Sequence, residues 1–242
     1  NQDNAGYLQA AGLYYELSEI MERENKDMIV NMLYVRSSLE RANESRREME
    51  AVNVKLLKQS ETDQMTGLAN RYRLNAYSEK VLDYCYEHRL PLAMEILDID
   101  FFKQYNDNYG HQQGDECIIA IADELKKMED RQTFCARYGG DEFIIIYAGI
   151  SAEEVHAKAG ALRQNIMNLK LEHLYSNALP IVTISQGISY GVPEEGNRSW
   201  DFLHTADMLL YQVKKRSRND ICIADIRGQE LDLSSKQEKV EP

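Results

Sequence analysis

The chain has 242 residues, of which 43% are hydrophobic and 28% are charged, and this balance indicates a globular protein rather than a disordered or fibrous one. Its formal net charge is -12, which disfavours general binding to the phosphate backbone of a nucleic-acid polymer. The four cysteines lie far apart and form no CxxC pair, so neither a zinc site nor a disulfide framework is indicated.

Membrane segments are also missing from the sequence pattern. No apolar run approaches the ~20 residues that a membrane-spanning helix needs, and we expect a cytoplasmic setting. The chain begins with Asn1 rather than Met, so we expect an upstream part that holds a sensor or a membrane segment. Any membrane association is then expected only through that upstream part.

The first 60 residues are predicted to be helical, because no proline precedes Pro91. A heptad seam starts at Met28, with spacings that alternate between four and three residues. Two of its positions are polar, which can fix the register of a dimer at a cost in stability. We predict a homodimer through these helices; the alternative is an amphipathic helix packed on its own domain. The seam consists of Met28, Met32, Val35, Leu39, Ala42, Arg46, Met49, Asn53 and Leu56.

Beyond Ser60, helix and strand patterns alternate. One pair of strands is joined by a tight turn, so the fold class is α/β (α+β), with a mixed sheet and helices packed on it. From about Arg227 the chain is polar, and residues 227–242 are predicted to be a disordered tail. The predicted elements are a turn at Gly67, a helix to about His88, a strand at 92–99, a helix at about 114–128, a hairpin of 133–138 and 142–148, a helix at 152–171, a strand at 180–190, a helix at 200–215 and a strand at 221–223.

Two acidic clusters stand at the ends of predicted strands. Asp98 and Asp100 close one strand, and Asp141 and Glu142 occupy the tip of the hairpin. If these strands are neighbours, Asp98 and Asp141 face each other across the ladder, and like charges that close need a cation between them. Oxygen ligands select hard ions such as Mg²⁺, which completes its coordination with phosphate oxygens and water. The pattern therefore favours a site for a nucleoside triphosphate.

Gly139 and Gly140 leave room beside these carboxylates, so that a bulky ligand can approach the backbone. A lone GGDE is weak evidence, since glycine and aspartate are common in turns. Four motifs in a fixed order are far more specific, and together they resemble the diguanylate cyclase (GGDEF) family from about Thr62 to Ala224. They are DQMTGLANR at 63–71, DIDFFKQYNDNYGHQQGDE at 98–116, RYGGDEF at 137–143 and ADMLLYQVKKRSRN at 206–219.

The resemblance implies a fold and a reaction. The fold is a five-stranded mixed sheet surrounded by helices, related to nucleotide cyclases and the polymerase palm, and it would occupy residues 61–226. The reaction condenses two GTP molecules into cyclic di-GMP with loss of two pyrophosphates. Each domain holds one GTP, so two domains must meet face to face. The helical segment 1–60 would then control whether the two sites oppose productively, under an upstream sensor.

Carried over position by position, the resemblance also assigns catalytic and metal-binding residues. Asp98 and Asp141 would bind Mg²⁺, with Mn²⁺ as an alternative ion, helped by the backbone carbonyl of Ile99. Glu142 would serve the metal site or help activate the attacking 3′-hydroxyl, and the sequence leaves these two roles open. Two-metal chemistry fits, since one ion lowers the pKa of the hydroxyl while the other stabilises the leaving pyrophosphate.

Further positions match the family's substrate contacts. Lys103, Lys214 and Arg218 correspond to residues that contact the phosphates, and they supply the local positive charge that the whole chain lacks. Asn106 and Asp115 correspond to the guanine-reading pair. Their chemistry suits guanine, which presents N1–H and an exocyclic amine as donors that a carboxylate accepts.

Other positions are interpreted as structural, or depart from the family pattern. Phe101 and Phe102 are interpreted as core and as wall of the substrate pocket. The RxxD product-inhibition motif is absent, because Asp130 and Thr133 stand at its two positions and Arg131 is one place off. We therefore predict no feedback inhibition by cyclic di-GMP through that route.

Two other functions compete with the enzyme. One is a nonenzymatic GGDEF-type module that binds GTP or dimerises in signal transduction, and the other is an oligomerisation element whose coiled coil is the working part. Nonenzymatic members usually lose a signature carboxylate or the guanine-reading residues, and this chain keeps them all. Release of pyrophosphate from GTP separates the enzyme from both alternatives.

Overall fold

The computed structural model of the chain describes residues 2–59, 61–229 and 231. It divides into two compact units, a helical one that ends at Gln59 and a globular one that follows, and each is described by itself. Most of the predicted tail, at 230 and 232–242, lies outside the described residues.

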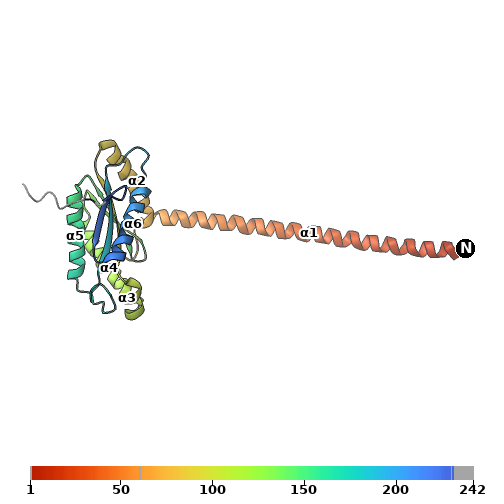
Figure 1. Cartoon of the computed structure of the whole chain (residues 1–242). Coiled ribbons are helices and arrows are strands. Elements are labelled where there is room, and N and C mark those ends of the chain that lie inside the picture. The colour runs from red at the N-terminus through yellow and green to blue at the C-terminus, as the bar shows by residue number, and fades with distance from the viewer. Residues whose placement is uncertain (1, 60, 230, 232–242) are drawn as a thin grey trace, which may run out of the picture. The chain divides into compact units, whose positions relative to one another are not determined.

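The helical unit is one uninterrupted helix, α1 (Gln2–Gln59) (Figure 1). The seam side chains are exposed on this single helix; Met28, Met32 and Leu39 are 62%, 73% and 59% exposed. An exposed apolar seam is the pattern of a helix that packs on a partner, and dimerisation stays a prediction. Despite the length of α1, no helix within the described ranges is apolar enough over a sufficient length to cross a membrane.

The globular unit is built on a five-stranded sheet in the order β2-β3-β1-β4-β5. The central strand β1 runs antiparallel to both of its neighbours, β3 and β4, whereas β4 and β5 are parallel. The predicted mixed sheet is thus confirmed. The strands are β1 (Leu92–Ile99), β2 (Thr133–Gly139), β3 (Glu142–Ala148), β4 (Ile184–Gly191) and β5 (Ile221–Asp225).

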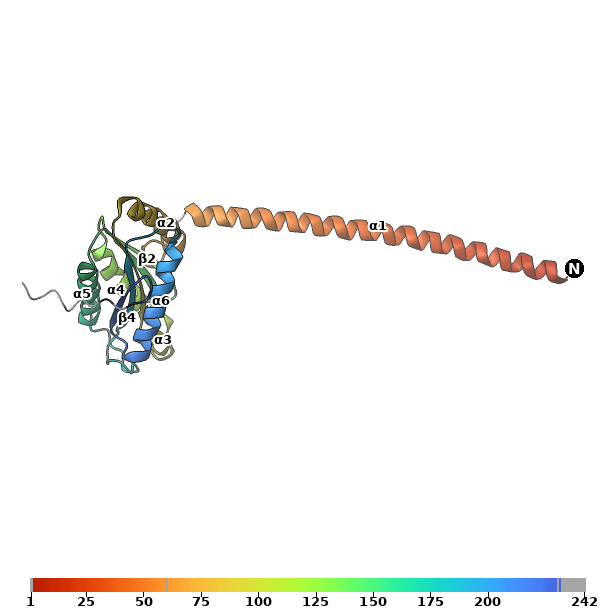
Figure 2. The same cartoon turned by 45° about the horizontal axis from the view of Figure 1, so that its top comes forward.

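Helices cover both faces of this sheet (Figures 1 and 2). On one face α2 packs on β2 and β3 while α6 packs on β4, β1 and β5; on the other face α4 and α5 pack on the sheet and on each other. The short α3 packs against α4. Because β1 is covered on both sides, nearly all of its residues are buried. The helices are α2 (Arg71–His88), α3 (Phe102–Tyr109), α4 (His111–Met128), α5 (Ala152–Asn168) and α6 (Ser199–Arg216).

The structure differs from the sequence-based expectation mainly after β1. The helix α3 was not predicted, and the helix expected from residue 114 begins at His111. Gly110 separates these two helices with a φ of +85°, a conformation that favours glycine. The strand expected from residue 180 begins at Ile184; before it, Ile181 makes only an isolated bridge to Glu172.

Candidate active site

The acidic clusters meet where β1 ends beside the start of β3. Asp98 and Glu142 are direct partners in the β1–β3 ladder, and Asp98 lies opposite Ser185 of β4 on its other side. The sequence placed Asp141 opposite Asp98, and this expectation needs correction. The two-residue turn from Gly139 to Glu142 contains Gly140 and Asp141, so that Asp141 precedes the first ladder position of β3.

The carboxylates at this junction repel one another. Asp98 is 8% exposed, and its pKa is raised to about 6, mainly by burial and also by the charges of Asp141 and Glu142. The ammonium of Lys214 works against this increase, since its Nζ lies 2.7 Å from Asp98 Oδ2. Burial also raises the pKa of Glu142, and the neighbouring charge of Asp141 adds to it. A further cation here would relieve the repulsion among the three carboxylates.

The donor set at this junction consists of oxygen atoms, which suits a hard divalent cation. Within the part of the chain that the structure describes, no three His, Cys, Asp or Glu side chains group closely enough to hold a metal ion by themselves. The predicted set is smaller, because it uses two carboxylates and the main-chain carbonyl of Ile99. A magnesium ion bound in this way keeps its remaining positions for water and phosphate oxygens.

The hairpin tip offers open space beside the carboxylates. A Cβ atom placed on Gly139 or Gly140 would meet no atom within 4 Å. Gly140 has a φ of +53°, so the turn itself also favours glycine there. The Arg137 side chain stabilises the turn, because its Nη2 and Nε donate to the carbonyl oxygen of Gly140 at 2.8 and 3.1 Å.

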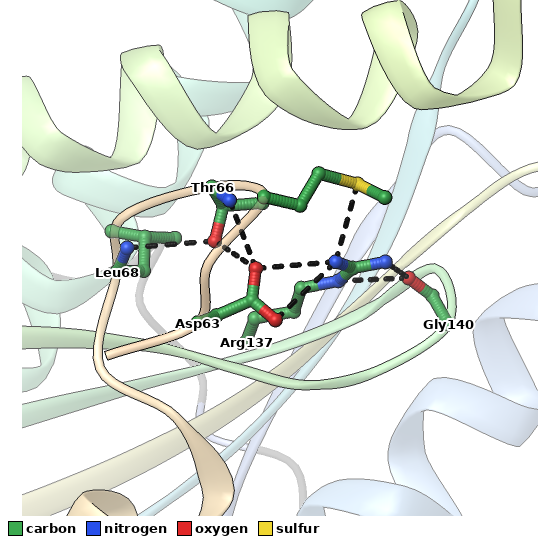
Figure 3. A network of polar contacts seen from close by, with 6 residues as sticks. Asp63, Thr66, Leu68, Arg137 and Gly140 are labelled. Atoms are coloured by element: carbon green, nitrogen blue, oxygen red, sulfur yellow. Dashed lines mark hydrogen bonds and ion pairs between the residues drawn. The ribbon is translucent and has the colours of Figure 1, made fainter. Parts of the chain in front are cut away.

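The same guanidinium connects the hairpin to the segment that precedes α2 (Figure 3). Arg137 Nη1 lies 3.2 Å from Asp63 Oδ1, and this carboxylate also accepts from the backbone and the hydroxyl of Thr66 at 2.9 and 2.7 Å. Burial by itself would raise the pKa of Asp63, but the bonds from Thr66 and Arg137 lower it. The DQMTGLANR motif is thereby fixed to the hairpin that carries the signature.

A second buried carboxylate holds the turn after β1 in place. Asp100 is fully buried, and it accepts from Thr183 Oγ1 at 2.8 Å, Ser185 Oγ at 2.7 Å and the backbone N–H of Asn219 at 3.0 Å. Arg218 Nη1 lies 3.6 Å from it. These bonds join the end of β1 to β4 and to the turn after α6.

The three predicted phosphate contacts occupy different environments. Lys214 is paired with Asp98, whereas the Arg218 guanidinium lies 4.2 Å above the ring of Phe101 and near Asp100. Lys103 is exposed on the first turn of α3. The fold therefore brings Lys214 and Arg218 to the carboxylates at the end of β1.

The predicted guanine-reading pair lies on the two packed helices α3 and α4. The Oδ1 atom of Asn106 is buried and has no hydrogen-bond partner among the described residues, while Asp115 is exposed. A Cβ on Gly114 would collide with this Oδ1, and it would come within 3.3 Å of the Phe102 ring. An unpaired buried carbonyl oxygen is costly unless a ligand donates to it. Phe102 is buried, as expected for a core residue, and Phe101 is half-buried; a place in the pocket wall stays a prediction.

Sequence reasoning assigned no role to Asp100, Arg137 or His173, which the structure places around the site. Asp100 was noted only as the second acid after the strand. His173 is buried, and its Nε2 lies 3.2 Å from the carbonyl oxygen of Phe101, 72 residues away. The residues around His173 show no motif, so only the tertiary structure connects it to the site.

Comparison with known proteins gives consistent matches to one family. Residues 60–220 match the family model described as diguanylate cyclase, GGDEF domain. The chain is 34% identical over 163 residues to the probable diguanylate cyclase DgcC of Escherichia coli (strain K12), covering 66% of this chain but 42% of that relative. The chain thus spans less than half the length of this curated relative.

Solved structures agree in fold. The GGDEF domain of DgcB from Caulobacter crescentus, solved in complex with c-di-GMP, has a TM-score of 0.62 and 30% identity, covering 68% of this chain and 93% of that one. A structure of the DgcB coiled coil and GGDEF domain, also in complex with c-di-GMP, has a TM-score of 0.63 and 28% identity, covering 76% of this chain and 97% of that one.

Proposed function

The chain belongs to the GGDEF-domain diguanylate cyclase family, and we propose that it condenses two GTP molecules into cyclic di-GMP and releases two pyrophosphates. The observation that carries this proposal is the pairing of Asp98 with Glu142 at the β1–β3 junction, beside the open turn at Gly140. This junction combines repelling carboxylates with open space beside Gly139 and Gly140. We assign the reaction to residues 61–226 and signalling and dimerisation to residues 1–60.

Asp98, Asp141 and the carbonyl of Ile99 would hold Mg²⁺, with Mn²⁺ as the alternative ion. When bound, a divalent ion supplies positive charge beside the 3′-hydroxyl and the leaving pyrophosphate. Glu142 serves the metal site or accepts the proton of the 3′-hydroxyl, and a carboxylate whose pKa is raised suits the second role. Both roles require Glu142 to lie beside the metal-binding carboxylate, and it is the ladder partner of Asp98.

The cations of the site would change partners when GTP binds. Lys214 now contacts Asp98, and Arg218 lies near Asp100. With a divalent cation held by Asp98, the Lys214 ammonium would be free to contact phosphate, because the carboxylate would have another cation beside it. Lys103, exposed on α3, is also proposed to contact the phosphates.

We assign guanine recognition to Asn106 and Asp115. The unpaired Oδ1 of Asn106 would accept from the base, and Asp115 would accept from the donor pair of guanine. Gly114→Ala tests this assignment, since its methyl group would displace the Asn106 carbonyl. We expect KM for GTP to rise about 10-fold or more, the effect of one lost buried hydrogen bond. An unchanged KM would refute the guanine assignment while leaving the metal assignment intact.

The exposed seam of α1 supports activity as a homodimer in which each domain contributes one GTP. An upstream sensor would control the reaction by changing how the two helices pair. Activity that rises faster than linearly with protein concentration supports the dimer requirement, and strictly linear activity in a monomeric preparation contradicts it. Because GTP is an intracellular nucleotide, the proposal places the reaction in the cytoplasm.

The absence of product inhibition is also part of the proposal. Both residues at the RxxD positions are bound to one lysine, since Lys158 Nζ lies 2.7 Å from Asp130 Oδ2 and 3.0 Å from Thr133 Oγ1. An arginine needed to bind a nucleotide phosphate is replaced there by an acid. Tight binding of cyclic di-GMP at these residues in a titration would contradict this part.

The principal experiment incubates the full chain with GTP and Mg²⁺ and identifies the nucleotide products. Asp141→Ala is expected to abolish pyrophosphate release without unfolding the chain. Asp123→Ala is the matched control, because it removes an exposed carboxylate that pairs with Lys126 on the surface of α4. If Asp141→Ala turns over normally, the metal assignment is wrong. If the parent binds GTP without releasing pyrophosphate, the nonenzymatic module is the better description.

A further inference from the structure

The segment between α5 and β4 forms a small antiparallel loop that holds one histidine in a buried position. Val182 donates its backbone N–H to Leu171 O at 2.8 Å, and His173 donates to Pro180 O at 3.0 Å. His173 is 1% exposed, whereas its neighbours Leu174 and Tyr175 are 64% and 54% exposed. The loop therefore directs one polar ring inward and leaves the next two side chains at the surface.

The histidine ring contacts the turn that follows β1. Its Nε2 lies 3.2 Å from the carbonyl oxygen of Phe101, and a carbonyl only accepts, so Nε2 carries the hydrogen. Burial lowers the pKa of His173, although the bond to Phe101 opposes this. Nδ1 is buried without a hydrogen-bond partner among the described residues, which leaves the Phe101 contact as the polar function of the ring.

Phe101 adopts a backbone conformation that is uncommon for a non-glycine residue. Its φ is +57°, in the left-handed region, and it is the N-cap of α3. Such a residue persists where its surroundings over-determine it, and these sites cluster where ligands bind. Its carbonyl accepts from both His173 and the backbone N–H of Tyr105, and its ring lies beneath the Arg218 guanidinium.

The same loop also contacts the far end of α3. The His173 ring meets the Tyr105 ring edge-on, with centroids 5.1 Å apart, and the backbone N–H of Leu174 donates to the Tyr109 hydroxyl at 3.0 Å. The loop therefore supports α3 at its N-cap, Phe101, and at its last residue, Tyr109. This short helix carries Lys103 and Asn106, and it begins just after the Ile99 carbonyl.

We propose that His173 is a positioning residue for nucleotide binding, and that its Nε2–H···O bond to Phe101 keeps the turn and α3 in the GTP-binding arrangement. The inference rests on the proposed function, because that function assigns Ile99, Lys103 and Asn106 to the nucleotide. Without the bond, Phe101 can relax toward negative φ, and the fraction of molecules with a competent turn falls. Apparent affinity then falls by the same factor, so the effect appears in KM for GTP and much less in kcat.

The test compares four variants of the full chain. His173→Phe keeps a ring of similar size but removes the donor, and we expect KM for GTP to rise about 10-fold. His173→Gln places an amide N–H near the position of Nε2, so KM should stay within about 3-fold of the parent. His173→Asn is as polar as Gln but too short to reach Phe101, and it should behave like Phe. Tyr175→Phe is the control on the exposed side of the loop and should match the parent.

Melting temperatures separate positioning from stability. If His173→Phe keeps the parent's KM, or if Gln and Asn raise KM equally, the proposal is overturned, because the donor is then irrelevant. If His173→Phe does not fold, the Gln and Asn pair decides the same question. A KM that rises only in proportion to a lower melting temperature across all variants also overturns it.

Affinity for a GTP analogue with a methylene bridge between the α- and β-phosphates, measured by calorimetry with Mg²⁺, separates this inference from the proposed function. If the parent binds the analogue but makes no cyclic di-GMP, the proposed reaction is wrong. The ratio of the analogue affinities of His173→Gln and His173→Asn still tests the role of His173 in that case. If the parent makes cyclic di-GMP and the ratio is one, only the inference fails. A parent that does not bind the analogue contradicts both.

Discussion

Asp98 and Asp100 stand two residues apart at the end of the same strand, yet their surroundings differ completely. Asp100 is fully buried, and two hydroxyls and a backbone N–H donate to it. Asp98 is nearly as buried, but its one ion-pair partner among the described residues is Lys214, and burial and the charges of Asp141 and Glu142 raise its pKa. The protein therefore supplies Asp100 with three hydrogen-bond donors, whereas Asp98 has the Lys214 ammonium and leaves acceptor positions open to a ligand.

This difference separates a structural carboxylate from one that can bind a ligand. A buried acid with all its acceptor positions used holds segments together, because removing it strands several donors. A buried acid with few donors and acidic neighbours is costly to keep ionised, and a cation relieves that cost. Substitutions at the two positions should therefore affect different properties of the protein.

The largest effect is expected from Asp98→Asn. This change removes the charge but keeps the shape, so pyrophosphate release from GTP should fall by about 10³-fold. Stability to urea should change by less than about 1 kcal/mol, since a neutral group suits a site that already disfavours the charge. Unfolding as large as that of an Asp100 variant would remove the distinction between the two carboxylates.

Asp100→Ala, in contrast to Asp98→Asn, should mainly lower the stability of the fold. It leaves the hydroxyls of Thr183 and Ser185 and the N–H of Asn219 without their acceptor, and the free energy of unfolding should fall by about 3–4 kcal/mol. Chemical denaturation monitored by the single tryptophan, Trp200, measures this loss. Asp100→Asn keeps one acceptor oxygen and should lose about half as much. Full stability in Asp100→Ala would mean that these bonds are not structural.

A third buried carboxylate, Glu95 in the middle of β1, should make the stability of the fold depend on pH. It is fully buried, and Tyr147 Oη and Gln186 Nε2 donate to it at 2.8 and 2.7 Å. Burial raises its pKa from 4.5 to about 7, so the folded chain binds more protons than the unfolded chain between these values. Its contribution to stability is complete below about pH 4.5 and is lost as the pH rises to about 7, by about 3 kcal/mol.

Glu95→Gln should remove that part of the pH dependence. Its amide N–H can donate to Gln186 Oε1, which has no partner among the described residues. Thermal denaturation at several pH values between 4.5 and 7 compares the two proteins. An identical slope in the parent and the variant would show that Glu95 does not titrate in this range.

The smallest effect is expected at the surface carboxylate Asp130. Its partner Lys158 is one-third exposed, and pairs of this kind contribute about 1 kcal/mol or less. Lys158→Ala should therefore change stability little and leave turnover unchanged. A loss as large as that of Asp100→Ala would show that exposure does not distinguish these carboxylates.

Local patterns determined much of the fold. The alternation of helices and strands, the hairpin and the mixed sheet were predicted, because the apolar runs and the glycine turn of 139–140 act over a few residues. The short helix α3 was missed since its sequence is largely polar and its position depends on packing against α4. The late start of β4 was missed because residues 180–182 pair with residues 171–173 inside the α5–β4 loop instead of extending the strand.

The sequence by itself determined which chemical groups this protein has for a site: the signature carboxylates, the cations and the amide, in an order specific to one family. Only the tertiary structure decided how they pair. The β1–β3 register set Glu142 rather than Asp141 opposite Asp98, and the folding of distant segments gave Asp100 its donors and Phe101 the support of His173. Residue types are local, but a ladder register and a contact across 72 residues depend on how the whole sheet packs.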